Sequence, residues 1–343
     1  MKKKMIQVGL GALGLTGFPF SGPGAQRGWA EIVKESKDWE PVAYVDVDEE
    51  RLRIARKRFG IPKEKLFVSL EEAIEKVPAD AVLIVTPTKY HAPAALAAIK
   101  AGLHVLVEKP FADSLAKAKE ITKKAEEKKV KLMVDQNYRF MRGAITVKKL
   151  LKNALVGDLG YVTFNKERAS YRYRGWRDET EDMMLVNSGI HSLDKIRAVT
   201  NLNPIDVIAS RWRPKWSWIP GYTTVTAVFR MENDIMFSYH ESASSLGQPC
   251  AEWRFEGSKG TIMWDDEESV TASLTEPAGT LQCNLIPMEL EERPCALHEF
   301  AESIRDGREP EASGRDNLLS LAMLFAAIES AKTGKLVKIK NLL

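Results

Sequence analysis

The stretch that decides the fold is residues 1–14, MKKKMIQVGLGALG, in which a short apolar run leads into Gly9, Gly11 and Gly14. This spacing, G-x-G-x-x-G, is typical of a tight turn between a first β-strand and a helix. Such a turn lets the backbone approach a pyrophosphate closely, while the N-terminal N–H groups of the helix face the anion. Glycine-rich turns without a ligand also occur, so the prediction depends on the residues that follow.

The second predicted strand, residues 41–47 (PVAYVDV), brings Asp46 to the place where an acid would contact the nucleotide. A carboxylate there binds both ribose hydroxyls of NAD and repels a 2′-phosphate, so we expect NAD rather than NADP. The nearby Arg51 and Arg53 leave NADP open. A helix cap, by Asp46 or Asp48, is the structural alternative.

The interval from Gly14 to Asp46 is 32 positions, whereas about 20 is usual in this fingerprint. The excess lies in residues 15–28, which are rich in Gly, Pro and Phe. Either the loop after the first strand is long, or its helix begins only near Gly28. In the second case Gly14 does not pack the helix against the strand, and the aromatic residues of this stretch cover the cofactor or reach another subunit.

Apolar runs alternate with helical patterns over the first 135 residues. The apolar runs lack strict alternation, as strands buried on both faces do, and they comprise residues 5–10, 41–47, 81–86, 104–109 and 131–136. The helical patterns comprise residues 28–37, 49–59, 70–77, 92–102 and 115–129. Strands that alternate with helices predict a parallel, doubly wound α/β sheet with right-handed crossovers.

The pattern changes after residue 140. A helix is expected from Arg142 to Gly157 or Gly160, and a helix within the second half is expected over residues 189–200, with a last one over 316–334. Strand-like runs otherwise follow one another, at residues 161–173, 205–213, 223–231, 235–242, 251–257 and 260–266. Consecutive strands predict a mostly antiparallel sheet. We therefore expect two domains, residues 1–136 and residues 137–343.

The composition excludes several classes of protein. The 343 residues contain 50 Lys and Arg and 47 Asp and Glu, a formal charge of +3, which gives no support to nucleic-acid binding. Three scattered cysteines, Cys250, Cys283 and Cys295, lack the spacing of a disulfide framework or a zinc site. We therefore expect no metal and a reducing compartment, the cytoplasm. No apolar run reaches the roughly 18 residues of a membrane span.

Three further motifs occur at specific places. Glu108-Lys109-Pro110 stands at the end of a predicted strand, and Thr86-Pro87 and His91 precede it. Gly189, His191 and Asp194 follow in the second half, within NSGIHSLD. Together these motifs resemble the Gfo/Idh/MocA family, which includes glucose–fructose oxidoreductase and inositol dehydrogenase. The resemblance covers most of the chain, and the combination is specific although no single motif would suffice.

The resemblance implies a Rossmann domain, a second α/β domain with a large open sheet, and a bound nicotinamide cofactor. It also implies sugar or polyol substrates, a C-terminal helix that packs back on the first domain, and homodimers or homotetramers formed through the sheet. To the glycines and Asp46 it adds the cofactor candidates Thr86, Pro87, His91, Glu108, Lys109 and Asn137. The substrate candidates that it adds are Tyr138, Arg139, Asn187, His191 and Asp194.

An aromatic and basic stretch, residues 171–177, supplies two more substrate candidates, Trp176 and Arg177. Interleaved arginines and aromatic rings stack on sugars, bind anions or fill subunit interfaces. A second such stretch, residues 211–218, is assigned to an interface or to the rim of a pocket.

Oxidation of a secondary alcohol removes a hydride from carbon and a proton from oxygen, and the protein must relay the proton. Lys109 can do so if burial lowers its pKa, and His191 has an ordinary pKa of about 6.5 that suits proton relay. Many family members carry Asp four residues before this histidine, where Asn187 stands here. An amide cannot act as a base, so either Lys109 and His191 suffice or Asp182 approaches instead.

Three functions follow from these residues. NAD-dependent dehydrogenation of a sugar, polyol or glycoside is expected first. A redox-neutral lyase, epimerase or glycoside-cleaving enzyme, with tightly bound NAD used for transient oxidation, is the alternative. A non-enzymatic NAD-sensing protein is the second alternative, against which the intact Lys109 and His191 argue.

Overall fold

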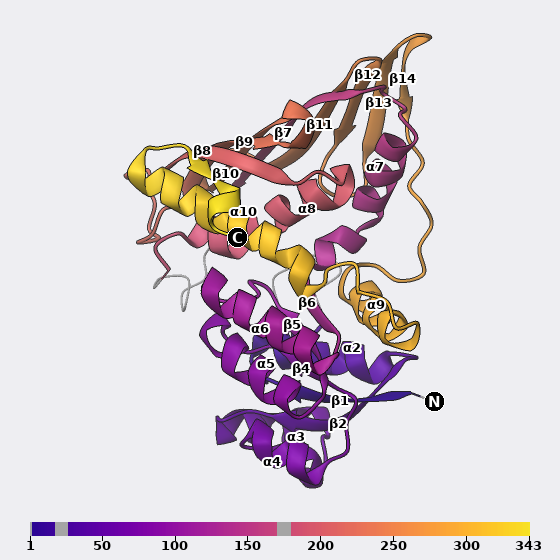
Figure 1. The fold of residues 1–343 in the computed structure, drawn as a ribbon, viewed down its shortest axis with the longest axis vertical. Coiled ribbons are helices and arrows are strands. Elements are labelled where there is room, and N and C mark those ends of the chain that lie inside the picture. Colours follow the sequence, from indigo (N-terminus) through magenta and orange to yellow (C-terminus); the bar gives the residue numbers. More distant parts are fainter. Residues whose placement is uncertain (1, 18–26, 170–179) are drawn as a thin grey trace. The chain divides into compact units, whose positions relative to one another are not determined.

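The computed structural model describes residues 2–17, 27–169 and 180–343. The chain forms two compact units (Figure 1), and it passes between them more than once. The first unit comprises Met1–Asn137 and Glu292–Leu318, and the second comprises Tyr138–Glu291 and Leu319–Leu343.

The first unit contains a six-stranded parallel sheet in the order β3-β2-β1-β4-β5-β6. This is the strand order of doubly wound dinucleotide-binding sheets, and it confirms the predicted fold class. Every residue of β4 and β6 is buried, which explains the continuous apolar runs in the sequence. The strands are β1 (Lys3–Val8), β2 (Trp39–Val45), β3 (Leu66–Phe67), β4 (Ala81–Ile84), β5 (His104–Glu108) and β6 (Leu132–Asp135).

Helices connect these strands, as their alternation in the sequence predicts. A single turn, α1, follows the glycine loop, and a longer helix begins at Trp29, as the second alternative for the long interval expects. The helices of this unit are α1 (Ala12–Leu15), α2 (Trp29–Glu35), α3 (Glu49–Phe59), α4 (Leu70–Lys76), α5 (His91–Lys100), α6 (Leu115–Lys128) and α9 (Glu292–Arg305).

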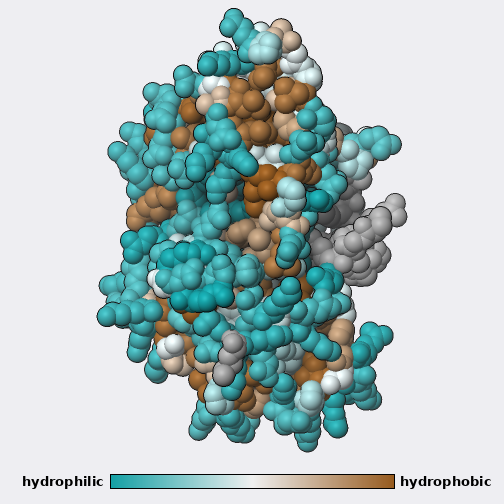
Figure 2. Space-filling model, turned by 90° about the vertical axis from the view of Figure 1, so that its right-hand side faces the viewer, coloured by the Kyte–Doolittle hydropathy of each residue, from teal (hydrophilic) through white to brown (hydrophobic). Residues whose placement is uncertain are grey.

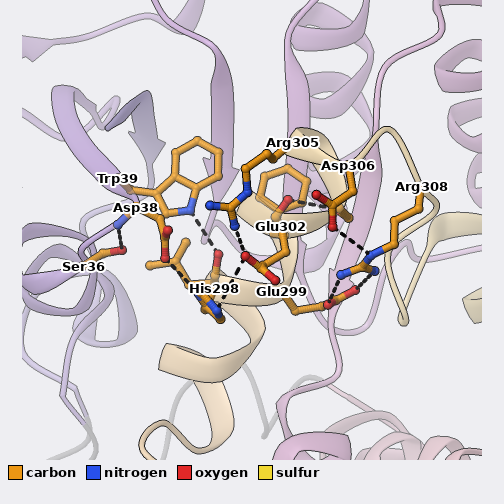
Figure 3. A network of polar contacts seen from close by, with 12 residues as sticks. Ser36, Asp38, Trp39, His298, Glu299, Glu302, Arg305, Asp306 and Arg308 are labelled. Atoms are coloured by element: carbon orange, nitrogen blue, oxygen red, sulfur yellow. Dashed lines mark hydrogen bonds and ion pairs between the residues drawn. The ribbon is translucent and has the colours of Figure 1, made fainter. Parts of the chain in front are cut away.

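Helix α9 belongs to the first unit although it lies far along the chain, and the sequence patterns did not predict it. The indole of Trp39 stacks on Phe300 with ring centroids 5.5 Å apart and donates to the Leu297 carbonyl at 3.0 Å. Figure 3 shows a row of ion pairs beside this contact, in which His298 lies 2.7 Å from Asp38. Because Trp39 is completely buried, α9 completes the core of the unit at β2.

The second unit contains a nine-stranded sheet in the order β14-β13-β12-β11-β7-β10-β9-β8-β15. Adjacent described strands pair antiparallel except β7 with β10, so the prediction of a mostly antiparallel sheet is confirmed. The strands are β7 (Leu159–Ala169), β8 (Pro204–Trp212), β9 (Thr224–Met231), β10 (Met236–Ser245), β11 (Cys250–Gly257), β12 (Gly260–Trp264), β13 (Val270–Thr275), β14 (Ala278–Gln282) and β15 (Val337–Lys338).

Helices α7 (Arg142–Lys152) and α8 (Ile190–Thr200) lie on one face of this sheet (Figure 1). The prediction that the first of them reaches Gly157 or Gly160 is wrong, because the backbone turns away at Ala154 and Gly157, both at positive φ. A π-helix, η5 (Leu185–Gly189), directly precedes α8. Helix α10 (Gly314–Thr333) starts in the first unit and ends in the second.

Large hydrophobic side chains also reach the surface. Figure 2 shows hydrophobic residues interspersed with hydrophilic ones over one face of the molecule. The most exposed tryptophan of the described residues is Trp216, with 62% of its surface exposed. Within the described part of the chain, no helix combines the length and the hydrophobicity needed to cross a membrane.

The Trp39→Ala variant is expected to lower the free energy of unfolding by about 3–5 kcal/mol, because a buried indole, its ring stack and its hydrogen bond are lost. Denaturant unfolding followed by circular dichroism measures the effect. The matched control is Trp216→Ala, which removes the same side chain from an exposed site. Equal unfolding midpoints for the two variants would contradict the role given to the contact between β2 and α9.

Candidate cofactor and substrate site

The glycine loop after β1 is held in a shape that side chains would disrupt. Gly9 has φ +100°, and a Cβ on it would lie 2.5 Å from the carbonyl oxygen of Val85. A Cβ on Gly14 would lie 2.2 Å from the Gly9 oxygen, so Gly14 packs against the loop itself. The amide of Gln7 braces the curve by donating to the carbonyls of Gly9 and Gly14 at 3.2 and 2.9 Å. The loop therefore presents bare backbone to a ligand.

Asp46 lies at the end of β2 beside this loop. Its carboxylate accepts hydrogen bonds from the backbone N–H of Leu10 at 2.7 Å and of Asp48 at 3.0 Å. Asp48, not Asp46, caps α3 by accepting from Glu50 N–H, so the capping alternative does not apply to Asp46. The two hydrogen bonds leave acceptor capacity on the carboxylate for ribose hydroxyls, so the residues present fit the adenosine half of NAD.

Arg51 adds a positive charge at the same place. Its guanidinium lies 3.6 Å from the Asp46 carboxylate and 3.2 Å from where a Cβ on Gly11 would stand. A cation above the glycine loop suits a phosphate group, whereas Arg53 is paired with Glu50 on the exposed face of α3. The structure thus places Arg51, but not Arg53, next to the loop.

His91 connects the loops that follow β4 and β5. One ring nitrogen lies 2.8 Å from the Thr86 carbonyl oxygen and the other 2.9 Å from the Pro110 carbonyl oxygen. Burial lowers the pKa of His91, although both carbonyl contacts favour its charged form. These contacts brace the loop that carries Lys109, and a direct contact of His91 or Pro87 with the cofactor stays a prediction.

Lys109 is half-buried directly after β5. The preceding Glu108 is buried, and its carboxylate accepts from the indole of Trp29 at 2.8 Å and from the backbone N–H of Lys109 at 3.2 Å. Asn137, at the start of the short helix η3 (Asn137–Phe140), is buried and donates to Glu292 at 3.3 Å. Hydrogen bonds within the protein therefore hold the side chains of Glu108 and Asn137 in place.

In the second unit, two predicted residues meet face to face. The ring of Tyr138 stacks on the imidazole of His191, with centroids 4.1 Å apart and planes 16° apart. His191 is in the first turn of α8, and Asn187 lies in the π-helix η5 that precedes it. A π-helical turn is often found at functional sites, because it changes the direction of the side chains within a helix.

Arg139 and Asp194, both expected to contact substrate, bind each other instead. The guanidinium donates to both carboxylate oxygens at 2.5 and 2.6 Å, and the hydroxyl of Ser320 donates to the same carboxylate at 2.7 Å. The side chains of Arg139 and Asp194 are almost completely buried. This pair joins η3 to α8 and so orients Tyr138 and His191. Contact with substrate stays a prediction for both residues.

Asp182 was the alternative to the missing carboxylate at Asn187. It forms an ion pair with Arg211 of β8, and burial raises its pKa. The guanidinium of Arg211 also lies over the ring of Tyr222 at 4.1 Å. The carboxylate of Asp182 is thus already paired with the guanidinium of Arg211. Trp176 and Arg177 lie outside the described residues.

A buried charge cluster was missed by sequence reasoning. The ammonium groups of Lys166, at 2.8 Å, and Lys195 both donate to the carboxylate of Asp266, which also accepts from the indole of Trp253 at 2.8 Å. The two lysines hold the pKa of Asp266 well below its usual range, while burial lowers the pKa of Lys195 to about 8. The ammonium of Lys195 lies 5.2 Å from the ring of Tyr138, so the cluster supports the stacked pair.

A sequence signal existed for one member of this cluster. Along β7, Lys166 is two residues after Phe164 and four after Val162, and all three are buried. A lysine in phase with apolar residues on a strand faces the core and needs a partner there. Its acidic partner, however, is 100 positions away and carries no such mark. Among the described residues, no cluster of His, Cys, Asp and Glu has the composition of a metal site.

Comparisons with known proteins agree with this geometry. A family model described as "Oxidoreductase family, NAD-binding Rossmann fold" matches residues 14–136, and the model of the same family's C-terminal alpha/beta domain matches residues 148–339. The chain belongs to the Gfo/Idh/MocA family. The resemblance found in the sequence is therefore confirmed, and the chain is an oxidoreductase with an NAD-binding Rossmann domain.

Members of the Gfo/Idh/MocA family with established names are similar over nearly the whole chain. D-apiose dehydrogenase of Paraburkholderia graminis is 27% identical over 320 residues, which cover 88% of this chain and 84% of that protein. Myo-inositol 2-dehydrogenase of Thermotoga maritima is 25% identical over 327 residues, 92% and 95% of the two chains. An oxidoreductase of Agrobacterium radiobacter, solved with NAD+, L-tartaric acid and magnesium, has the same fold, with TM-score 0.87, 22% identity and full coverage of both chains.

The Gly9→Ala variant is expected to lose affinity for NADH by more than about tenfold, because the new methyl group collides with the Val85 carbonyl and the loop must change shape. NADH fluorescence titration measures the affinity. The control is Gly279→Ala on β14, where nothing lies within 4 Å of the new atom. Unchanged NADH affinity in Gly9→Ala would exclude this loop from the cofactor site.

The Asp266→Asn variant is expected to lower the free energy of unfolding by about 3–5 kcal/mol at neutral pH, because two buried lysines lose their counter-charge. The folded-state pKa of Asp266 is depressed, so its contribution is present above about pH 4 and is lost as the pH falls below that value. Denaturant unfolding at several pH values measures both effects. The control is Asp265→Asn, a neighbouring exposed carboxylate; equal losses in the two variants would contradict the assignment.

Proposed function

We propose that this enzyme transfers a hydride from a secondary alcohol of a sugar, polyol or glycoside to NAD. The observation that carries the proposal is the glycine loop with its bare backbone, hydrogen-bonded to Asp46 in a sheet whose strand β5 is directly followed by Lys109. The relatives named for D-apiose and myo-inositol support a polyhydroxylated substrate.

Within this proposal, the residues divide between two domains. Residues 1–136, completed by Glu292–Leu318, bind the cofactor, with Gly9, Gly11, Gly14 and Asp46 holding its adenosine diphosphate half, and the remainder of residues 137–343 binds the substrate. NAD is favoured over NADP because Asp46 repels a 2′-phosphate, although Arg51 beside it gives NADP a cation to pair with. We propose the cytoplasm as the location, as the scattered cysteines indicate.

The chemistry that the protein supplies is proton transfer. The bound nicotinamide accepts the hydride from the carbinol carbon. Lys109 polarises the hydroxyl oxygen and, with His191, takes the proton that leaves it. Tyr138 holds the imidazole plane of His191 by stacking, and Asn187 donates and accepts hydrogen bonds but cannot take the proton itself.

We further propose that the outer face of the nine-stranded sheet forms a homodimer or homotetramer. Strand register places four exposed hydrophobic residues on this face, and they span three strands: Tyr161, Ile208, Trp212 and Met236. Polar residues such as Arg230 and Thr226 lie between them, and a mixture of exposed aromatic, hydrophobic and polar side chains suits a subunit interface. Analytical ultracentrifugation tests it.

The function is tested by incubating the enzyme with NAD or NADP and a panel of sugars, polyols and glycosides while following the absorbance of NADH. Steady formation of NADH with one substrate class supports the dehydrogenase. Disappearance of a substrate without net NADH, in a protein that releases bound cofactor on denaturation, would replace the proposal with the redox-neutral alternative.

The Lys109→Ala variant is expected to lose about 100-fold or more of kcat, because the proton-accepting amine is absent, and to retain its affinity for NADH. Steady-state kinetics and NADH titration measure the two quantities. Lys100→Ala, at the exposed end of α5, removes the same charge elsewhere and serves as the control. Turnover close to wild type in Lys109→Ala would exclude the catalytic role.

A further inference from the structure

Two acidic residues meet at the carboxyl ends of β5 and β6. Glu108 and Asp135 are register partners in the parallel pairing of these strands. Asp135 has no exposed surface and Glu108 is 4% exposed. Their carboxyl groups are within hydrogen-bonding reach of each other, and a hydrogen bond between two carboxyl groups requires that one of them carries a proton.

The surroundings of the pair decide which group carries that proton. Glu108 accepts hydrogen bonds from the indole of Trp29 and the backbone of Lys109, whereas no nitrogen or hydroxyl of the described residues donates to either oxygen of Asp135. Burial and the adjacent Glu108 raise the pKa of Asp135 well above its usual range. The proton therefore resides mainly on Asp135.

Two positive charges act on the pair. The guanidinium nitrogen of Arg293 lies 3.6 Å from an oxygen of each acid, so this arginine of α9 bridges them. The side chain of Lys109 is the second cation that acts on Asp135, and the buried His91 of α5 is close enough to Glu108 for its charge to be felt. With one proton on the pair, a single carboxylate remains to interact with Arg293 and Lys109.

The place of the pair in the fold connects it to the cofactor, and this step rests on the proposed function. In a doubly wound sheet each half binds one mononucleotide. The glycine loop and Asp46 belong to the half built on β1 and β2, so the nicotinamide belongs to the half built on β4, β5 and β6. The nicotinamide ring is positively charged in NAD+ and neutral in NADH.

We propose that Asp135 is a specificity-determining residue for the redox state of the cofactor, because the Glu108–Asp135 pair releases its proton when the cationic ring binds. The balance is simple: the protonated protein and NAD+ give the deprotonated complex and one free proton, and NADH binds with no proton released. The second carboxylate then compensates the charge of the ring. No atom other than this proton is exchanged.

The sign of the effect follows from linkage. A ligand whose binding releases one proton binds more tightly as the pH rises, by up to about tenfold for each pH unit in the range where the free pair is protonated. NADH affinity has no such dependence. The ratio of the dissociation constants of NAD+ and NADH therefore falls with rising pH, while contributions from the shared adenosine and phosphates cancel in the ratio.

The test is to titrate NADH by fluorescence, and NAD+ by displacement of NADH, between about pH 6 and about pH 9. In the wild type the ratio is expected to fall by up to about tenfold per pH unit over part of this range. In Asp135→Asn, whose amide mimics the protonated acid, the ratio is expected to stay constant. Asp80→Asn is the control, since it removes a carboxylate at the opposite end of β4 and is expected to behave as the wild type.

Two results would overturn this inference: a constant ratio in the wild type, or a wild-type slope in Asp135→Asn. If that variant does not fold, calorimetry of the wild type in buffers of different ionisation enthalpy counts the protons released on NAD+ binding, and a count of zero has the same consequence. If neither nucleotide binds at any pH, the proposed function fails instead, so the two failures are distinguishable.

Discussion

The parallel pairing of β1 with β2 and β4 brings the carboxyl ends of these strands to one edge of the sheet, and the candidate cofactor residues depend on that edge. The hydrogen bond from Leu10 N–H to Asp46 connects the end of β1 to the end of β2. Gly9 lies against the Val85 carbonyl, directly after β4. Neither contact survives a change of register, because a shift of one residue would turn Asp46 to the other face of the sheet. Local chemistry at this edge is thus a consequence of strand order.

The alternating architecture could be predicted because its signals are local: buried parallel strands are continuously apolar, and the helices between them show their own spacing. Other parts depend on partners distant in sequence. The place of helix α9 in the first unit is set by its contact with Trp39, which is distant in sequence. The parallel pairing of β7 with β10 has no signal in the sequence of either strand. The end of α7 was misplaced because positive φ at Ala154 is set by the turn and not by the residue type.

For the candidate site, the sequence indicated residues but not the contacts that those residues make. The family resemblance indicated His191, Arg139 and Asp194 as substrate candidates. In the structure Arg139 and Asp194 form an ion pair with each other, which cannot be inferred from sequence when the two residues are 55 positions apart. Asp135 lies at the end of the apolar run of residues 131–136, so its place at the end of a strand could be predicted. Its buried acidic neighbour and Arg293 become visible only when the strands are paired and α9 is in place.

The sequence of the first unit is divided into two segments by about half of the chain, and this division affects how the unit folds during translation. When residues 1–137 have left the ribosome, Trp39 lacks Phe300 and Glu108 lacks Arg293, and the backbone N–H of Val134 in β6 lacks its acceptor, the Ala312 carbonyl. The N-terminal sheet must wait for residues 292–318, which emerge after the whole nine-stranded sheet except its last short strand. Of the two units, the one whose first residues are synthesised earlier is therefore completed only by residues synthesised late, and a fragment that ends at Asn137 lacks part of its own core.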